Sequence, residues 1–246
     1  MEMEMEMEME TSKETEIKAS ELFKAAELGN TSLFSSFSKD QLAKFLSFRN
    51  DDGRSLLHVA ASSAQSKVVE ILAGADLEGK VINSKDEEGW APIHSASSIG
   101  NIDIIQILLS KGADVNLKND GGRTALHYAA SKGWKKIAEM LLAHGANVNV
   151  KDKVGCTALH RAASTGNSEL CELLIEEGAD IDAIDKVNQT PLMTAVICDN
   201  RQVSLLLVRH GADVDVEDKE GYTALGRAPK DLQDAIIDAA KAMMEG

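Results

Sequence analysis

The sequence predicts an all-α solenoid of about seven helix–turn–helix units, each 33 residues long, joined by β-hairpin fingers. Two short sequence phrases recur in phase, and the steps between their copies are nearly constant. A repeat period between about 20 and 50 residues is typical of stacked repeat architectures. Aromatic residues make up only 4% of the chain. A core of Leu, Ile, Val and Ala suits thin layers of small helices.

The first phrase has the form Thr-x-Leu-His-x-Ala, and its histidine position serves as a marker. The markers are separated by 36, 33, 33, 33 and 33 residues. They are His58, His94, His127, His160, Met193 and Gly226. The second phrase, Gly-Ala-Asp or Gly-Ala-Asn, runs in the same register from Gly112, Gly145, Gly178 and Gly211. Together the two phrases are the signature of ankyrin repeats. The three extra residues before His94 fall around 74–79 and predict a longer finger there.

One repeat illustrates the expected local structure. Thr124 begins a short helix in which Ala129 and Ala130 are small enough for a neighbouring helix to approach closely. Gly133 ends that helix, and a second helix starts at about residue 135. Gly145 then supplies the left-handed residue that stops the second helix. Because one unit cannot bury its own apolar face, its stability comes from stacking on its neighbours.

The chain divides into a tail and one ankyrin-repeat domain. Residues 1–16, which contain Met-Glu five times over, are expected to be a disordered acidic tail. The domain covers 17–246, with an N-terminal cap repeat over 17–50, five central repeats over 51–217 and a C-terminal cap repeat over 218–246. All five Phe lie in the first fifth of the chain and would seal the first cap. In the last cap, Asp231 is the expected N-cap of a long amphipathic helix.

Charge and composition exclude several classes of function. The net charge of −14 argues against nucleic acid, because affinity for the phosphate backbone comes from clustered Lys and Arg. No apolar stretch approaches the roughly 20 residues needed to cross a bilayer, so no membrane partner is expected. The three cysteines form no CxxC pair and there is no export signal, so we expect free thiols and a cytoplasmic and nuclear location.

No catalytic or cofactor motif stands out. The sequence has no GxGxxG, GxxxxGK[ST], GxSxG or HExxH, so we expect no enzyme, no cofactor and no metal. The repeated histidines are the conspicuous candidates for metal ligands. Equivalent positions in stacked helices lie roughly 8–10 Å apart, which is too far for one zinc ion. We therefore expect each imidazole to bond to turn backbone and to tie one repeat to the next. Cys171 is expected to be a small buried hydrophobe, and Cys156 to lie near a finger.

Function must therefore lie on the extended concave surface formed by the fingers and the exposed side of each first helix, which we call the finger face. Aromatic and Arg side chains, which are enriched at protein interfaces, occur there among charges of both signs. Such a pattern favours a protein partner with complementary charges. On the fingers the expected residues are Asp52, Arg54, Glu87, Trp90, Arg123, Lys153 and Tyr222; on the first helices they are Tyr128, Lys132, Arg161 and Thr165.

Several details beyond the repeat consensus resemble a known family. They are the fingers Gly53-Arg54 and Gly89-Trp90, the segments His-Tyr-Ala-Ala-Ser-Lys at 127–132 and Leu-His-Arg-Ala-Ala at 159–163, and the ending Met-Glu-Gly. Over about residues 20–246 the chain resembles the gankyrin family, ankyrin-repeat chaperones of proteasome regulatory-particle assembly.

The resemblance implies a partner and a role. The finger face would bind the C-terminal helical domain of one proteasomal ATPase subunit. Asp52, Arg54, Glu87 and Lys132 would meet opposite charges there, with Trp90 close by. The bound chaperone, a monomer on its own, would obstruct premature docking of the base onto the proteolytic core. The family's Leu-x-Cys-x-Glu motif for retinoblastoma-type proteins has no match, because the corresponding stretch ends in Ala-Val-Ile-Cys198.

An alternative hypothesis for the function uses the same finger face but a different protein partner. A signalling or transcription adaptor, such as an inhibitor of kinases or of a DNA-binding factor, would bind another protein there, because fold does not fix function.

Overall fold

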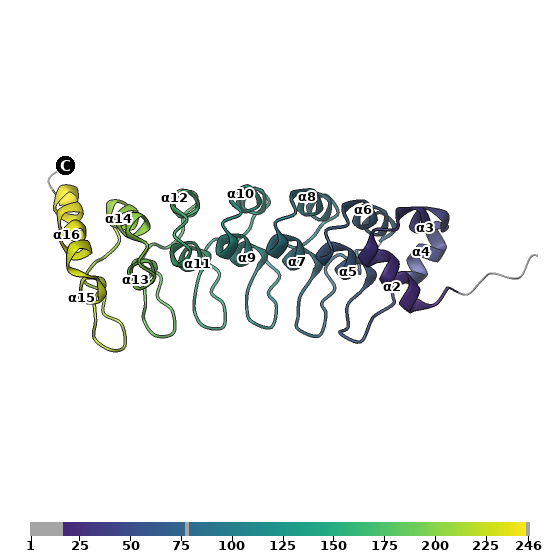
Figure 1. Cartoon of the computed structure of the whole chain (residues 1–246), viewed down its shortest axis with the longest axis horizontal. Coiled ribbons are helices and arrows are strands. Elements are labelled where there is room, and N and C mark those ends of the chain that lie inside the picture. Colours follow the sequence, from purple (N-terminus) through teal and green to yellow (C-terminus); the bar gives the residue numbers. More distant parts are fainter. Residues whose placement is uncertain (1–16, 77–78, 245–246) are drawn as a thin grey trace, which may run out of the picture.

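The computed structural model describes residues 17–76 and 79–244, and the tail predicted for residues 1–16 lies outside them. Pairs of short helices stack side by side along one axis, with α2 near one end of the stack and α16 at the other (Figure 1). The helices are α2 Ala19–Leu28, α3 Thr31–Ser36, α4 Lys39–Phe45, α5 Leu56–Ser62, α6 Ser66–Ala75, α7 Pro92–Ile99, α8 Ile102–Ser110, α9 Ala125–Lys132, α10 Lys135–Ala143, α11 Ala158–Ser164, α12 Ser168–Glu176, α13 Pro191–Ile197, α14 Arg201–Arg209, α15 Ala224–Arg227 and α16 Lys230–Met244.

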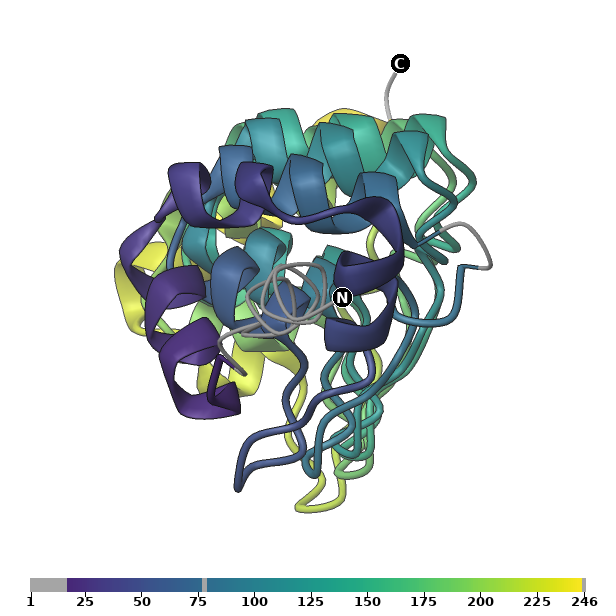
Figure 2. The ribbon, with the colours of Figure 1, turned by 90° about the vertical axis from the view of Figure 1, so that its right-hand side faces the viewer.

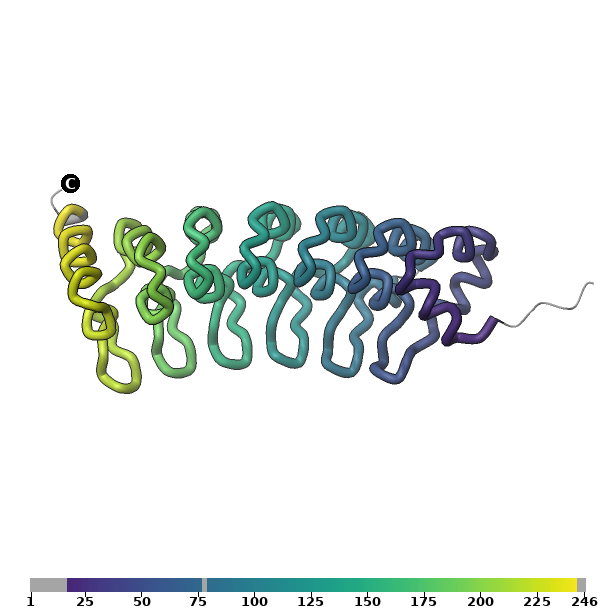
Figure 3. The backbone as a smooth tube through the Cα atoms, in the orientation of Figure 1, coloured from purple at the N-terminus to yellow at the C-terminus, as the bar shows by residue number. Residues whose placement is uncertain are grey.

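The helices form two layers. The first helices of successive repeats (α5, α7, α9, α11 and α13) pack against one another along the stack, and each also packs against the second helix of its own repeat. The loops between repeats all project from the same side, next to the layer of first helices (Figure 3). Viewed along the stack, the two helical layers and the loops follow one another in order (Figure 2). No helix in the described segments is both long and apolar enough to cross a bilayer.

Helix starts in the central repeats follow from the first sequence phrase. Thr157 caps α11 by accepting the backbone N–H of His160, and the imidazole Nδ1 of His160 accepts the N–H of Thr157 at 3.1 Å. The same reciprocal pair joins Ser55 to His58 at the start of α5. Such capping pairs satisfy N–H groups that would otherwise lack partners at a helix start.

The core consists of the small and branched residues that the repeat pattern predicts. Leu126, Ala129 and Ala130 of α9 are buried, as are Ile137 and Leu141 of α10. With methyl side chains at 129 and 130, the backbones of α7 and α11 can approach α9 from both sides.

The fingers are turns rather than β-strands, since no strand is assigned to residues 17–76 or 79–244. One bond closes each finger, as where Asp152 N–H donates to the Cys156 carbonyl at 3.0 Å. Another bond joins neighbouring fingers, as where Lys153 N–H donates to the Gly121 carbonyl at 2.8 Å. In the predicted longer finger, the Asp76 carboxylate accepts the backbone N–H of Val81 at 2.8 Å, while residues 77–78 lie outside the description.

The two ends of the stack are closed differently. At the front, Phe34 is fully buried and Phe37 packs edge-on against it and against Phe45, which gives the expected aromatic seal. At the back, Leu232 and Ile236 of α16 are buried. The sequence expectation that Asp231 caps this helix is wrong by two residues. The helix begins at Lys230, after a proline, and Asp231 lies in its first turn.

Candidate protein-binding face

Four buried histidines on the first helices hydrogen-bond to backbone carbonyl groups behind the finger face. Each donates its Nε2–H to a carbonyl oxygen further along the chain, as predicted, at distances of 2.9 to 3.1 Å. Burial lowers the pKa of His58 and of His127 to about 4, although their carbonyl partners oppose the shift. Both imidazoles are therefore neutral at pH 7, and their role is structural. The pairs are His58 with Trp90, His94 with Leu117, His127 with Cys156, and His160 with Gln189.

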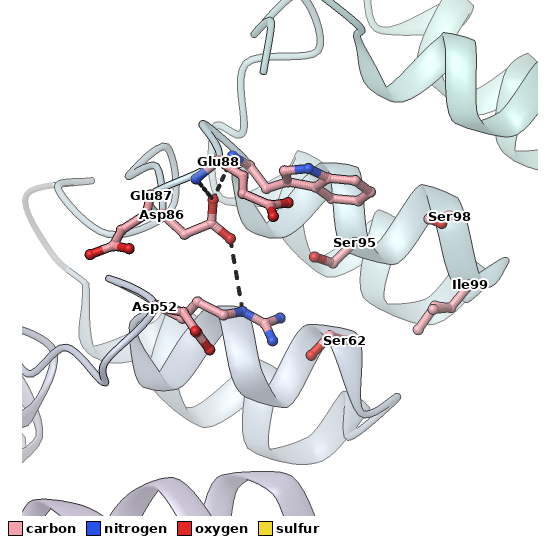
Figure 4. A pocket seen from close by; sticks show the side chains of 10 residues that line it. Asp52, Ser62, Asp86, Glu87, Glu88, Ser95, Ser98 and Ile99 are labelled. Carbon is pink, nitrogen blue, oxygen red and sulfur yellow. Dashed lines mark hydrogen bonds and ion pairs between the residues drawn. The ribbon is translucent and has the colours of Figure 1, made fainter. Parts of the chain in front are cut away.

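A groove of about 490 Å³ opens on the face between the repeats of α5 and α7 (Figure 4). Its centre is the Asp86 carboxylate, which accepts the backbone N–H of Glu88 at 3.1 Å and of Trp90 at 2.8 Å. The Arg54 Nε lies 3.9 Å from Asp86 Oδ2. The residues that line the groove are Asp52, Arg54, Ser62, Asp86, Glu87, Glu88, Trp90, Ser95, Ser98 and Ile99.

An aromatic pair continues the face beyond this groove. The rings of Trp90 and Tyr128 lie 4.5 Å apart at 40°, so they join one finger to the first helix of the next repeat. The Tyr128 hydroxyl accepts a hydrogen bond from Asn119 Nδ2 at 2.8 Å. Burial raises the pKa of Tyr128, although that hydrogen bond acts in the opposite direction. Both aromatic side chains remain half-buried.

Two of the predicted binding residues, Arg123 and Arg161, share the Asp152 carboxylate as a partner within the chain. Arg161 forms an ion pair with Asp152, and Arg123 reaches the same carboxylate from the preceding finger at 3.4 Å. The Asp152 side chain is only 1% exposed. Burial works against its ionisation, but the Arg161 guanidinium prevails and lowers the pKa of Asp152. Arg161 is therefore less available to a partner than the sequence pattern suggested.

Three of the predicted charged positions, Asp52, Glu87 and Lys132, are exposed on the surface. Asp52 and Glu87 are exposed at the mouth of the groove, where Glu87 N–H donates to the Asp52 carbonyl at 3.1 Å. Lys132 is exposed in the last turn of α9 and forms no ion pair within the described residues. The structure thus brings Asp52, Arg54, Glu87 and Trp90 together at one groove. Tyr128 lies beside Trp90, whereas Arg161 and Tyr222 belong to later repeats.

Sequence reasoning missed the middle of the groove. Asp86 and Ser95 line it, and so does Glu88. Arg227 was missed as well; it pairs with Asp218 and lies 4.9 Å from the ring centre of Tyr222. A signal was present in the spacing, because Arg227 follows Asp218 by nine residues, as Arg161 follows Asp152.

The geometry defines a repeat solenoid with a binding face, and comparison with known proteins agrees. A family model for ankyrin repeats (3 copies) matches residues 22–119, 74–152, 112–185 and 159–241. The chain therefore belongs to the ankyrin-repeat family. A solved structure, the ankyrin-repeat domain of Bcl-3, a member of the IkappaB protein family, superposes with a TM-score of 0.75. It is 26% identical, and the match covers 88% of this chain and 97% of that one.

Curated relatives match over shorter stretches. Protein phosphatase 1 regulatory subunit 27 of Homo sapiens is 36% identical over 84 residues, or 30% of this chain and 51% of the relative. RelA-associated inhibitor of Mus musculus is 39% identical over 66 residues, or 27% and 8%. Alpha-latrotoxin-Lh1a of Latrodectus hasselti is 32% identical over 65 residues, or 26% and 5%. The chain thus spans at most about half the length of these relatives.

The family model and the Bcl-3 structure show an ankyrin-repeat solenoid, and the names of two relatives describe a regulatory subunit and an inhibitor. Within the described part of the chain, no group of three or more His, Cys, Asp or Glu side chains is arranged to hold a metal ion. The Cys171 thiol is buried, which raises its pKa to about 12 and makes it a poor nucleophile.

Proposed function

We propose that this chain is a non-catalytic chaperone for assembly of the proteasome regulatory particle, and that its finger face binds the C-terminal domain of one proteasomal ATPase subunit. One observation carries the proposal. The residues through which the sequence resembles the gankyrin family, Arg54, Trp90 and Tyr128, occupy one continuous stretch of the finger face.

The charge pattern of this stretch supports a folded, charged partner. Acidic Asp52 and Glu87 stand at one end, and basic Lys132 stands on α9 beyond the aromatic pair. A partner with the opposite arrangement would gain in encounter rate and in specificity. Because these three side chains are exposed, their ion pairs should weaken as salt rises.

The experiment is a titration of the full chain against the isolated C-terminal domains of the six proteasomal ATPases, at about 50 mM and about 500 mM salt. We expect saturable binding to one domain that weakens at high salt. Glu87→Lys and Lys132→Glu should each lower the affinity by at least about tenfold. The matched controls are Glu172→Lys on the second helix α12 and Lys111→Glu directly after the second helix α8, and both reverse exposed charges. No binding to any domain, or equal losses in the controls, would refute the proposal.

The relatives favour a second candidate function. Their names describe a regulatory subunit of protein phosphatase 1 and an inhibitor associated with RelA, and the Bcl-3 domain is a structural neighbour. The chain would then be an adaptor or inhibitor that binds a signalling protein through the finger face. The same titration with protein phosphatase 1 catalytic subunit and with RelA tests this alternative. Binding to either that is lost in Glu87→Lys supports it, and no binding to both counts against it.

A further inference from the structure

The fingers share one construction that is repeated along the chain. The first finger residue is Asp or Asn, and its side chain accepts the backbone N–H of the residue four positions later. The residue nine positions after the first finger residue lies on the first helix of the same repeat, and in three repeats its side chain contacts the first finger residue. We call the first finger residue the finger acid or amide. The residue four positions later is the wall position, and the residue nine positions later is the helix position.

In the last repeat the helix position is an arginine, and its guanidinium lies against the residues at the other two positions. The finger acid is Asp218, the wall residue is Tyr222 and the helix residue is Arg227. The Arg227 guanidinium pairs with Asp218 and lies 4.9 Å from the Tyr222 ring centre. In the repeat of Asp152, the helix position is again an arginine, Arg161, which pairs with that carboxylate. Two of the finger carboxylates, Asp152 and Asp218, are thus paired with guanidinium groups of the chain itself.

The repeat of Asp86 has the carboxylate and the wall but no arginine. Its wall residue is Trp90, and its helix residue is Ser95, whose short side chain is almost fully buried. The groove of about 490 Å³ lies at this place and is lined by all three residues (Figure 4). The space that a guanidinium occupies beside Asp218 and Tyr222 is therefore open beside Asp86 and Trp90.

Arg54, from the preceding finger, does not fill this space. Its Nε is 3.9 Å from Asp86 Oδ2, which is too long for a hydrogen bond. That Nε is buried without a hydrogen-bond partner, and Nη2 donates instead to the His58 carbonyl at 3.3 Å. Arg123 stands in the same relation to Asp152, at 3.4 Å, and Arg161 binds that carboxylate as well. One arginine from the preceding finger thus leaves room for a second.

The charges around the opening select for a cation. The groove is lined by the carboxylates of Asp52, Asp86, Glu87 and Glu88 and by a single basic side chain, Arg54. Trp90 supplies the aromatic ring that attracts a cation most strongly. A guanidinium suits this pair of groups better than an ammonium, because it is planar, stacks on rings and can form two parallel bonds to a carboxylate.

We propose that the groove is a subsite for one arginine side chain of the bound protein, with the guanidinium paired to Asp86 and stacked on Trp90. The proposal rests on the finger face being a protein-binding surface, but not on which protein binds there. The incoming arginine would take the place that Arg227 takes in the last repeat.

The test uses the full chain and small probes. The Trp90 indole resonance and the backbone amides of Glu88 and Trp90 are followed by NMR during titration with N-acetyl-arginine amide. Matched titrations use the lysine and citrulline amides. We expect saturable shifts with the arginine probe, affinity weaker by at least about fivefold for the lysine probe, and no saturation with the uncharged citrulline probe.

Three variants locate the binding. Ser95→Arg places an arginine at the helix position, as in the last repeat, and should lower the affinity for the probe by at least about tenfold. Asp86→Asn should do the same with the finger intact, because Asn50 and Asn119 occupy that position in other repeats. The control is Thr194→Arg, the same change in the repeat whose wall residue is Gln189, and it should leave binding unchanged.

Unchanged thermal melting of each variant establishes that it is folded. Absence of saturable shifts, equal affinity for the lysine probe, or unchanged binding in Ser95→Arg would overturn the proposal. Failure of every ATPase domain to bind, with the probe still bound, would remove the proposed function and leave the subsite intact.

Discussion

His58 Nε2 lies 2.9 Å from the carbonyl oxygen of Trp90, 32 residues further along the chain. The first helix of one repeat is thereby bonded to the finger of the next. Since Trp90 also lines the groove, this buried bond fixes the position of a surface side chain. His58, which joins two adjacent repeats, thus also positions Trp90 on the finger face.

The equivalent link at His127 can be tested by removal. His127→Ala leaves the Cys156 carbonyl and the Thr124 N–H without their imidazole partner in a buried place. We expect the free energy of unfolding to fall by about 2–4 kcal/mol, from the lost partners and the cavity. Urea denaturation measures this. The control is His144→Ala, on an exposed side chain, with an expected change within about 0.5 kcal/mol. Equal effects in both variants would contradict the structural role.

The same histidines predict how stability depends on pH. The pKa values of His58 and His127 are lowered by burial to about 4, whereas an unfolded histidine titrates near 6.5. Below pH 6.5 the unfolded chain binds protons that the folded chain does not. The contribution is therefore complete above pH 6.5 and is lost as the pH falls towards 4.

Between pH 7 and pH 5 we expect each of these two histidines to cost about 2 kcal/mol of unfolding free energy. Urea midpoints across this range measure the slope. In His127→Gln, which cannot titrate, the slope should be smaller by roughly one histidine's share. A slope that is the same in the variant and in the unaltered chain would contradict the assignment.

The repeat architecture could be predicted in detail because its signals are local and periodic. A Thr or Ser three residues before His specifies the capping pair, and a Gly such as Gly133 ends the helix with its positive φ of 73°. The start of α16 was misplaced because Asp231 is as good in a first turn as at an N-cap.

The groove was harder to predict, for a physical reason. Periodicity assigns Arg161 to the finger face, but it does not show that the side chain turns back to a buried carboxylate, Asp152. Likewise, the groove lies where Ser95 is small, whereas three other repeats carry Tyr128, Arg161 or Arg227 at the equivalent position. A groove forms where a side chain is short. It can be recognised only once the side chains of neighbouring repeats are placed in three dimensions.

The carboxylate of Asp152 should contribute more to stability than the equivalent Asp185. Both accept backbone N–H groups of their own finger, but in the described residues only Asp152 is also paired with arginines. Asn can keep the backbone bonds while removing the charge. We expect Asp152→Asn to lower the unfolding free energy by about 2 kcal/mol more than Asp185→Asn, because Arg161 then loses its buried partner. Equal losses, measured by urea denaturation at pH 7, would contradict this.

Contact between fingers requires glycine at one tip for two reasons. Gly122 has a φ of +74°, and a Cβ there would lie 2.8 Å from the Lys153 backbone nitrogen. Gly112 has a φ of +84°, but a Cβ there meets nothing within 4 Å. Gly112→Ala should therefore cost about 1 kcal/mol, from backbone strain alone. Gly122→Ala should cost at least about 1 kcal/mol more, because the two fingers must separate. Thermal and urea unfolding of the two variants measure the difference, and a smaller loss at Gly122 would refute the steric argument.

Trp90 should dominate binding on the finger face, because it lies between the groove and Tyr128 and is half-buried before any partner arrives. For whichever protein binds in the titrations, Trp90→Ala should lower the affinity by at least about thirtyfold, as expected of a central aromatic anchor. Trp90→Tyr should retain most of the affinity, since Tyr222 occupies the same position in the last repeat. Trp134→Ala, at the more exposed tryptophan before the second helix α10, should change affinity by less than about threefold. Calorimetric titration of the three variants, each first checked by thermal melting, separates binding from folding. If Trp134→Ala weakens binding as much as Trp90→Ala does, the partner does not use the finger face.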